Sequence, residues 1–193
     1  CEPPKKSGGF YLIKKIFSAF DKIRQNSTKS GVIIRSQERR KSMEYKINDE
    51  TLAVLPINQT NCEVIDRNGN IPLDYSSMKV IEDSCEYFGV NYKARRRGTY
   101  NFINTRYKAP IIIEEKNRII FFPLTSPSKN SNLWISYNNV LEYKPGKVKN
   151  ETIVKFKSGI SIMVPSSYYS FNNQYSKAAR LFASYEVRTS KNW

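Results

Sequence analysis

The sequence of 193 residues contains no histidine and only three cysteines, and both shortages exclude chemistry. Without histidine there is no Ser-His-Asp or Cys-His catalytic arrangement and no imidazole ligand for a metal. Cys1, Cys62 and Cys85 form no C-x-x-C pair, so we expect no zinc site and no other cofactor. An odd, sparse set of this kind fits a reducing cytoplasm, and Cys62 and Cys85 are interpreted as small core residues.

Long hydrophobic runs and enzymatic motifs are also missing. No uncharged apolar stretch approaches the roughly 18 residues of a membrane-spanning helix. The first apolar stretch, "FYLIKKIFSAF", is divided by two lysines and does not resemble a signal peptide, so we expect a cytoplasmic protein. The sequence has no G-x-G-x-x-G, no G-x-x-x-x-G-K-[ST] and no G-x-S-x-G. We therefore expect no enzymatic activity.

Acidic residues are few, and the resulting charge points to an anionic partner. There are 17 Asp and Glu against 32 Lys and Arg, a net charge of +15, which favours nucleic acid or an anionic membrane surface. Residues 1–42 hold 11 basic and 3 acidic residues, and residues 43–193 hold 21 and 14. We therefore divide the chain into a basic N-terminal extension, 1–42, and a domain, 43–193. The sequence opens with Cys1 and Met43 could be a start codon, so 1–42 is either an extension or translated upstream sequence.

Within residues 1–42 the apolar spacing predicts a short amphipathic helix. Its apolar positions are Phe10, Ile13, Ile16, Phe17, Phe20 and Ile23, and its basic positions are Lys14, Lys15, Lys22 and Arg24. One interpretation is a helix that docks on an anionic membrane surface or a partner protein. The alternatives are a helix packed on the domain and an extension with no role.

From residue 43 the pattern predicts an α+β, mainly β fold. Short runs rich in Val, Ile, Tyr and Phe alternate with turn residues, as in antiparallel hairpins. The expected strands are "TLAVLPI", "CEVIDRNGNIPLDY" with a turn at Asn68-Gly69, "MKVIEDS", "PIIIEEKNRIIFFP", "LWISYNN", "VLEYK" and "TIVKFKSGISIMVP". A C-terminal amphipathic helix is predicted after Pro165, with its apolar face formed by Phe171, Tyr175, Ala178, Leu181, Phe182 and Tyr185.

One segment concentrates basic and aromatic residues. The 27 residues between Glu86 and Glu114 hold no acid and six cations, namely Lys93, Arg95, Arg96, Arg97, Arg106 and Lys108. Because Gly98 follows the arginine triplet, we expect Arg95–Arg97 on a protruding loop, which could enter a narrow A·T minor groove. The alternatives are a solvated loop, or an RNA-binding surface on which Tyr100 and Phe102 stack.

Several stretches in register resemble the ComK family of competence transcription factors. These are "SCEYFGVNYKARRRGTY" (84–100), "KAPIII" (108–113), "IIFFPLTSPS" (119–128), "LWIS" (133–136) and "VPSSYYSFNNQ" (164–174), with "EYKINDETLAVLP" (44–56) similar to the family's first strand pair. The resemblance implies an activator of genes for DNA uptake and recombination. It also implies an oligomer that binds paired A/T-rich boxes on double-stranded DNA largely through the minor groove, and that acts on the transcription machinery.

The resemblance also implies site residues and a form of regulation. The family's basic loop aligns with Arg95, Arg96 and Gly98-Thr99, and Lys108 lies in the next motif. From the charges of the segment and this alignment together, we expect a DNA-binding set of Lys93, Arg95, Arg96, Arg97, Thr99, Arg106 and Lys108, with Lys93, Arg106 and Lys108 on phosphates and the triplet probing groove width. The family is controlled by a protease adaptor that engages a tail after the C-terminal helix. This sequence stops at Trp193, which argues against the same route here.

Overall fold

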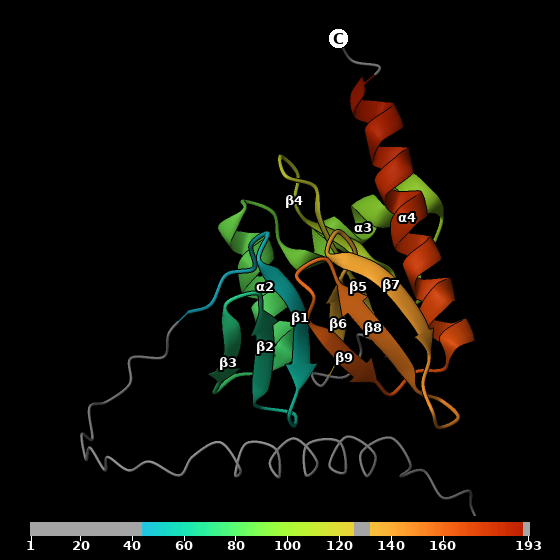
Figure 1. The fold of residues 1–193 in the computed structure, drawn as a ribbon. Coiled ribbons are helices and arrows are strands. Elements are labelled where there is room, and N and C mark those ends of the chain that lie inside the picture. The colour runs from blue at the N-terminus through green and yellow to red at the C-terminus, as the bar shows by residue number, and fades with distance from the viewer. Residues whose placement is uncertain (1–43, 126–131, 191–193) are drawn as a thin grey trace, which may run out of the picture. The chain divides into compact units, whose positions relative to one another are not determined.

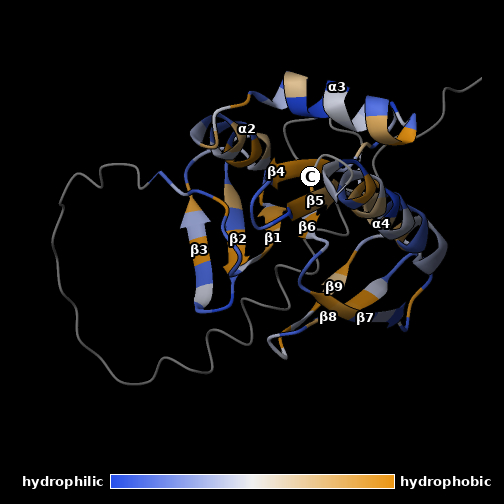
Figure 2. Ribbon diagram, turned by 90° about the horizontal axis from the view of Figure 1, so that it is seen from above, coloured by the Kyte–Doolittle hydropathy of each residue, from blue (hydrophilic) through white to orange (hydrophobic). Residues whose placement is uncertain are grey.

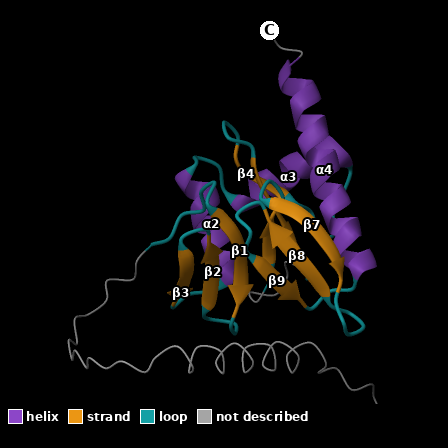
Figure 3. Cartoon of the chain, viewed as in Figure 1, coloured by secondary structure: helices purple, strands orange, loops and turns teal. Residues whose placement is uncertain are grey.

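The computed structural model describes residues 44–125 and 132–190. The helix predicted within residues 1–42 lies outside these ranges. The elements in chain order are β1 (Thr51–Pro56), β2 (Cys62–Asp66), β3 (Gly69–Leu73), α2 (Ser77–Tyr87), α3 (Tyr92–Ile103), β4 (Ile111–Glu114), β5 (Ile119–Pro123), β6 (Trp134–Ser136), β7 (Val140–Pro145), β8 (Thr152–Phe156), β9 (Ser161–Val164) and α4 (Tyr168–Ser190) (Figures 1 and 3).

The strands form two antiparallel sheets. The larger sheet has six strands in the order β3-β2-β1-β6-β5-β4, and the smaller has three in the order β7-β8-β9. The predicted hairpins β2–β3, β4–β5 and β8–β9 are confirmed by their pairing. The α+β, mainly β fold with a C-terminal helix is therefore confirmed, and within residues 44–125 and 132–190 no helix is long and apolar enough to cross a membrane.

The six-stranded sheet is buried on both faces. One face packs against α2, where Val80, Ile81 and Cys85 belong to the same cluster as Phe121 and Trp134. The other face packs against the small sheet and α4 (Figure 2), in a cluster whose buried members include Leu52, Ile120, Phe122, Phe156, Phe171 and Leu181. Burial of both faces explains the continuous apolar runs of β4 and β5, because every side chain then needs an apolar environment. Cys62 and Cys85 are free and buried, as expected of core residues.

One predicted strand is wrong. The segment "MKVIEDS", residues 78–84, lies in helix α2. The Ser76 side chain caps this helix by accepting a hydrogen bond from the Lys79 backbone N–H at 3.2 Å. The buried residues Met78, Ile81 and Cys85 recur at helical spacing and cover the sheet. The β-branched pair Val80-Ile81 favoured a strand locally, and packing on the sheet outweighs that preference.

Candidate nucleic-acid interface

The arginine triplet lies on a helix, so its predicted placement on a protruding loop is wrong. Gly89, at φ +81°, follows the end of α2, and Asn91 then caps α3 by accepting a hydrogen bond from the Ala94 N–H at 2.9 Å. Helix α3 ends at Asn104, whose backbone adopts the left-handed conformation and donates to the Tyr100 carbonyl at 2.8 Å. Figure 3 shows α3 as a helix separate from α2. The triplet is thus held by a regular backbone.

The inner face of α3 carries two of the predicted site residues. The Thr99 side chain is buried, and its hydroxyl donates a hydrogen bond to the Pro110 carbonyl at 2.8 Å. The Arg95 side chain is only 8% exposed and forms an ion pair with Glu115. The ring of Tyr92 on the same face packs edge-on against Trp134 at 6.4 Å. These contacts attach α3 to the large sheet, and they direct the Thr99 hydroxyl and one terminal nitrogen of Arg95 to partners within the protein.

The outer face of α3 carries the other cations of the helix. Lys93, Arg96 and Arg97 are exposed and follow the i, i+3, i+4 spacing of one helical face. Arg96 donates to the Arg106 carbonyl at 2.9 Å. Lys93 and Arg97 make no hydrogen bond or ion pair with any residue described here. Their charges are therefore available to an external anion.

The loop after α3 adds Arg106 and Lys108 to the same region. The Arg106 guanidinium stacks on the Tyr100 ring, 4.6 Å from its centroid, and also donates to the Tyr100 hydroxyl at 3.2 Å. The Lys108 ammonium donates to the Leu124 carbonyl at 3.0 Å. Tyr100 therefore holds Arg106 in place beside α3, where stacking orients the guanidinium before any ligand arrives. This use of Tyr100 also places it against Arg106 instead of leaving its ring free to stack on a base.

Helix α4 brings further cations that the sequence did not assign to the site. Lys177 donates from its ammonium to the Tyr107 carbonyl at 3.1 Å, and Arg188 donates to the Asn101 carbonyl at 2.8 Å. The Arg188 guanidinium also lies 4.3 Å from the centroid of the Phe102 ring. The sequence contains one indication of their exposure, because Lys177 and Arg180 fall outside the predicted apolar face of the helix. Their proximity to the basic segment could not be predicted, because it results from the packing of α4 against α3.

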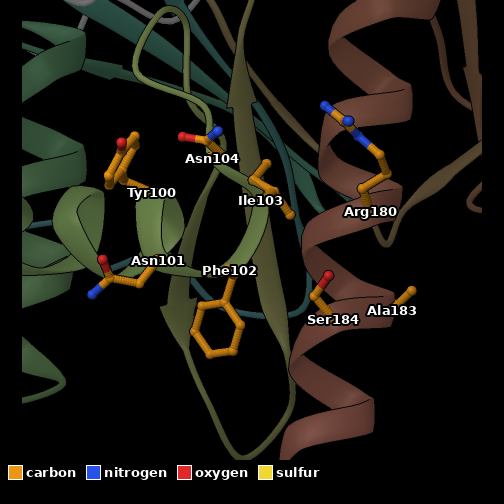
Figure 4. A pocket seen from close by; sticks show the side chains of 8 residues that line it. All are labelled: Tyr100, Asn101, Phe102, Ile103, Asn104, Arg180, Ala183 and Ser184. Atoms are coloured by element: carbon orange, nitrogen blue, oxygen red, sulfur yellow. The ribbon is translucent and has the colours of Figure 1, made fainter.

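An open groove of about 630 Å³ separates α3 from α4. It is lined by Tyr100, Asn101, Phe102, Ile103, Asn104, Arg180, Ala183 and Ser184. Figure 4 shows the Arg180 side chain pointing from α4 toward Ile103 and Asn104. The walls combine amide and hydroxyl groups with one guanidinium and a few apolar side chains, and no carboxylate lines the groove.

The surface is electropositive with little internal compensation. Of the nearby carboxylates, Glu115 pairs with Arg95, Glu186 pairs with Arg118, and Glu82 of α2 interacts electrostatically with Lys93. Burial lowers the pKa of Lys177, and the neighbouring cations Lys108 and Arg180 lower that pKa further. Among the described residues no group of three or more carboxylates and cysteines could hold a metal ion. The arrangement of cations is suited to binding a polyanion.

A family model described as "ComK protein" matches residues 42–190. The competence transcription factor of Bacillus subtilis (strain 168) is 32% identical over 147 residues, which cover 75% of this chain and 76% of that protein. No solved structure matches the chain.

Proposed function

This chain belongs to the ComK protein family, and on that premise we propose that it regulates competence genes as an activator that binds double-stranded A/T-rich DNA. The observation that carries the proposal is the outer face of α3. Lys93, Arg96 and Arg97 are exposed there, beside Arg106 and Lys108, and no acid interrupts residues 87–113. Such a group of cations favours binding to DNA phosphates, because binding releases the counterions condensed on the duplex.

The site residues divide into two roles in this proposal. Lys93, Arg106 and Lys108 contact phosphates, and Arg96 and Arg97 reach into the groove. Thr99 and Arg95 hold α3 on the sheet, given their burial and their partners Pro110 and Glu115. An α-helix with its side chains is about 10–12 Å wide and the minor groove of B-DNA is about 6 Å wide. Helix α3 therefore lies across the sugar-phosphate backbone while its arginine side chains enter the groove, where A·T tracts strengthen the negative potential.

The first experiment is a gel-shift titration of the full chain at near-physiological salt. It compares a duplex with two phased A/T-rich boxes with a length-matched G·C-rich duplex. We expect the A/T-rich duplex to bind about a thousandfold more tightly, the scale of specific regulators. Equal, weak binding to both duplexes would refute sequence-specific recognition. Tighter binding to a single-stranded RNA competitor would favour the RNA interpretation instead.

A third duplex identifies the groove that is read. Replacing A·T by inosine–cytosine pairs keeps the minor-groove pattern of A·T, because inosine lacks the guanine N2 amino group, and changes the major-groove pattern. Minor-groove reading predicts that the inosine duplex binds like the A/T-rich duplex. Binding like the G·C-rich duplex would show that α3 reads the major groove.

Two variants distinguish recognition of the DNA minor groove by Arg97 from nonspecific attraction of its charge to phosphate. Arg97→Gln is expected to lower the preference for A/T-rich over G·C-rich DNA by about tenfold, the order of one poorly matched base pair. The matched control is Lys149→Gln on the β7–β8 turn, which Figures 1 and 2 place away from α3. The control should keep the preference unchanged. An equal loss of affinity on both duplexes would show that Arg97 contacts only phosphate.

Two boxes on one duplex also fit a homo-oligomer in which each copy presents its own α3. Light scattering of the chain with and without the two-box duplex tests this part of the proposal. A single copy bound per two-box duplex would contradict it. The DNA-binding proposal itself would stand in that case.

A further inference from the structure

Helix α4 carries cations that converge with the loop after α3 on one spot. The ammonium of Lys177 donates to the Tyr107 carbonyl at 3.1 Å, and Lys108 is the next residue of that loop. Lys108 and Arg180 both act electrostatically on Lys177. Three cations from two separate parts of the chain are thus neighbours. None of them forms an ion pair with a carboxylate within the described residues.

Resting on the function proposed above, we propose that Lys177 and Arg180 of α4, together with Lys108, form a second DNA contact, which binds a backbone phosphate beside the α3–α4 groove that Arg180 lines. The outer face of α3 contacts one part of the duplex, and this cluster holds the sugar-phosphate strand beside it. The cluster deepens the proposed interface by adding an α4 contact. It carries affinity and not sequence preference, because phosphates are the same in every sequence.

The two lysines are already oriented by the protein. Lys177 and Lys108 each donate to one backbone carbonyl, of Tyr107 and of Leu124, which leaves two of the three ammonium protons for a ligand. Lys108 also holds a left-handed backbone conformation at φ +47°, which is unfavourable for a residue with a side chain. Such conformations persist where the surrounding structure enforces them, often at functional sites. The loop is fixed in the shape that brings Lys108 next to α4.

The electrostatic environment favours an anion at this position. Lys177 is half-buried, and desolvation and the two neighbouring cations all oppose its charge. A phosphate between these groups would offset this repulsion, and its oxygens accept the hydrogen bonds that the cations offer. Arg180 reaches into the groove beside Asn104 (Figure 4), so its guanidinium faces the space that a strand would occupy.

The test compares the salt dependence of DNA binding by the full chain and by Lys177→Gln/Arg180→Gln. Counterion release predicts that each lost phosphate contact reduces the slope of log K against log salt by about 0.9 and weakens binding about fivefold at 0.15 M salt. Because the cluster holds one phosphate, we expect a slope smaller by about 0.9 and about fivefold weaker binding on the two-box duplex. The weakening should be equal on A/T-rich and G·C-rich DNA. Lys149→Gln is the matched control, and Arg180→Lys should retain the slope because it retains the charge.

A second readout does not depend on bulk affinity. Phosphate ethylation interference should identify a position that blocks binding of the wild-type chain and has no effect on Arg180→Gln. Arg180 is exposed, so this single variant tests the site even if loss of the Lys177 hydrogen bond disturbs the fold. An unchanged salt slope and interference pattern, with the preference for A/T-rich DNA intact in the wild type, would overturn the second site alone. A wild-type chain without that preference would overturn the proposed function.

Discussion

Replacing Gly98 by alanine tests the helical placement of the arginine triplet directly. Gly98 sits inside α3, its φ lies outside the left-handed region, and no described atom lies within 4 Å of the position that a Cβ would take. In a helix interior glycine is about 0.8–1.0 kcal/mol less favourable than alanine, because it loses more backbone entropy on folding. Since Gly98 needs neither a special conformation nor the missing Cβ, Gly98→Ala should stabilise the protein by most of that difference.

The assay is urea unfolding followed by circular dichroism, with thermal unfolding as a second measure. A gain of about 1 kcal/mol corresponds to a rise in melting temperature of about 2–4 °C for a chain of this size. The matched control is Gly89→Ala. Gly89 has φ +81°, where a side chain costs about 1–2 kcal/mol, so this variant should lose stability.

The two substitutions are therefore expected to change the free energy of unfolding in opposite directions. A loss of stability in Gly98→Ala similar to that in Gly89→Ala would show that the chain turns at Gly98, as the sequence alone suggested. It would also remove the exposed helical face on which the proposed DNA interface depends. DNA affinity of Gly98→Ala should equal that of the wild type or exceed it, because α3 keeps its side chains and gains rigidity.

Thr99→Val replaces the buried hydroxyl bonded to Pro110 with a methyl group and should cost about 1–3 kcal/mol in urea unfolding, with DNA affinity below the unfolding transition unchanged. Normal stability with weakened binding would instead make this hydroxyl a DNA contact. Burial raises the pKa of the Cys62 and Cys85 thiols from 9.0 to about 12. The unfolded chain therefore loses these protons first, and stability should fall as pH rises from 9 toward 12, by up to about 1.4 kcal/mol per pH unit for each thiol. Replacing both cysteines with alanine should flatten this fall in urea midpoints measured between pH 8.5 and 10, and an equally steep fall would contradict the assignment.

The large sheet could be predicted from the sequence because its hairpins carry local signals. Apolar runs such as "PIIIEE" and "RIIFFP" meet at a turn of polar residues, and such turns specify pairing between neighbouring strands. The distant pairing of β1 with β6 has no local signal, and neither does the order of the strands. The β1–β6 pairing and the strand order are set by tertiary packing, because apolar residues must cover both faces of the large sheet at the same time.

The basic segment was harder to interpret because its helical pattern is weakly apolar. The inner face of α3 combines Tyr92 and Phe102 with Arg95 and Thr99, so hydrophobic periodicity is nearly absent. Gly98 is typical of a turn, whereas the three arginines before it have high helix propensity, so the local signals conflict. The capping residue Asn91 was the available indication of a helix. The cations of the proposed site could be named from charge, and Thr99 from the family alignment, but their division into inner and outer faces required the helix.

The pairing of β1 with β6 also bears on the order in which parts of the fold can form during synthesis. During synthesis β1, β2 and β3 leave the ribosome long before β6, so the apolar edge of β1 stays unpaired until Trp134 and Ile135 arrive. Trp134 is also the residue against which Tyr92 of α3 packs. Beside its contacts with Pro110 and Glu115, the basic helix therefore gains its packing against Trp134 only when β6 is in place. An unfinished chain therefore has all the arginines of the triplet before the large sheet that supports α3 is complete.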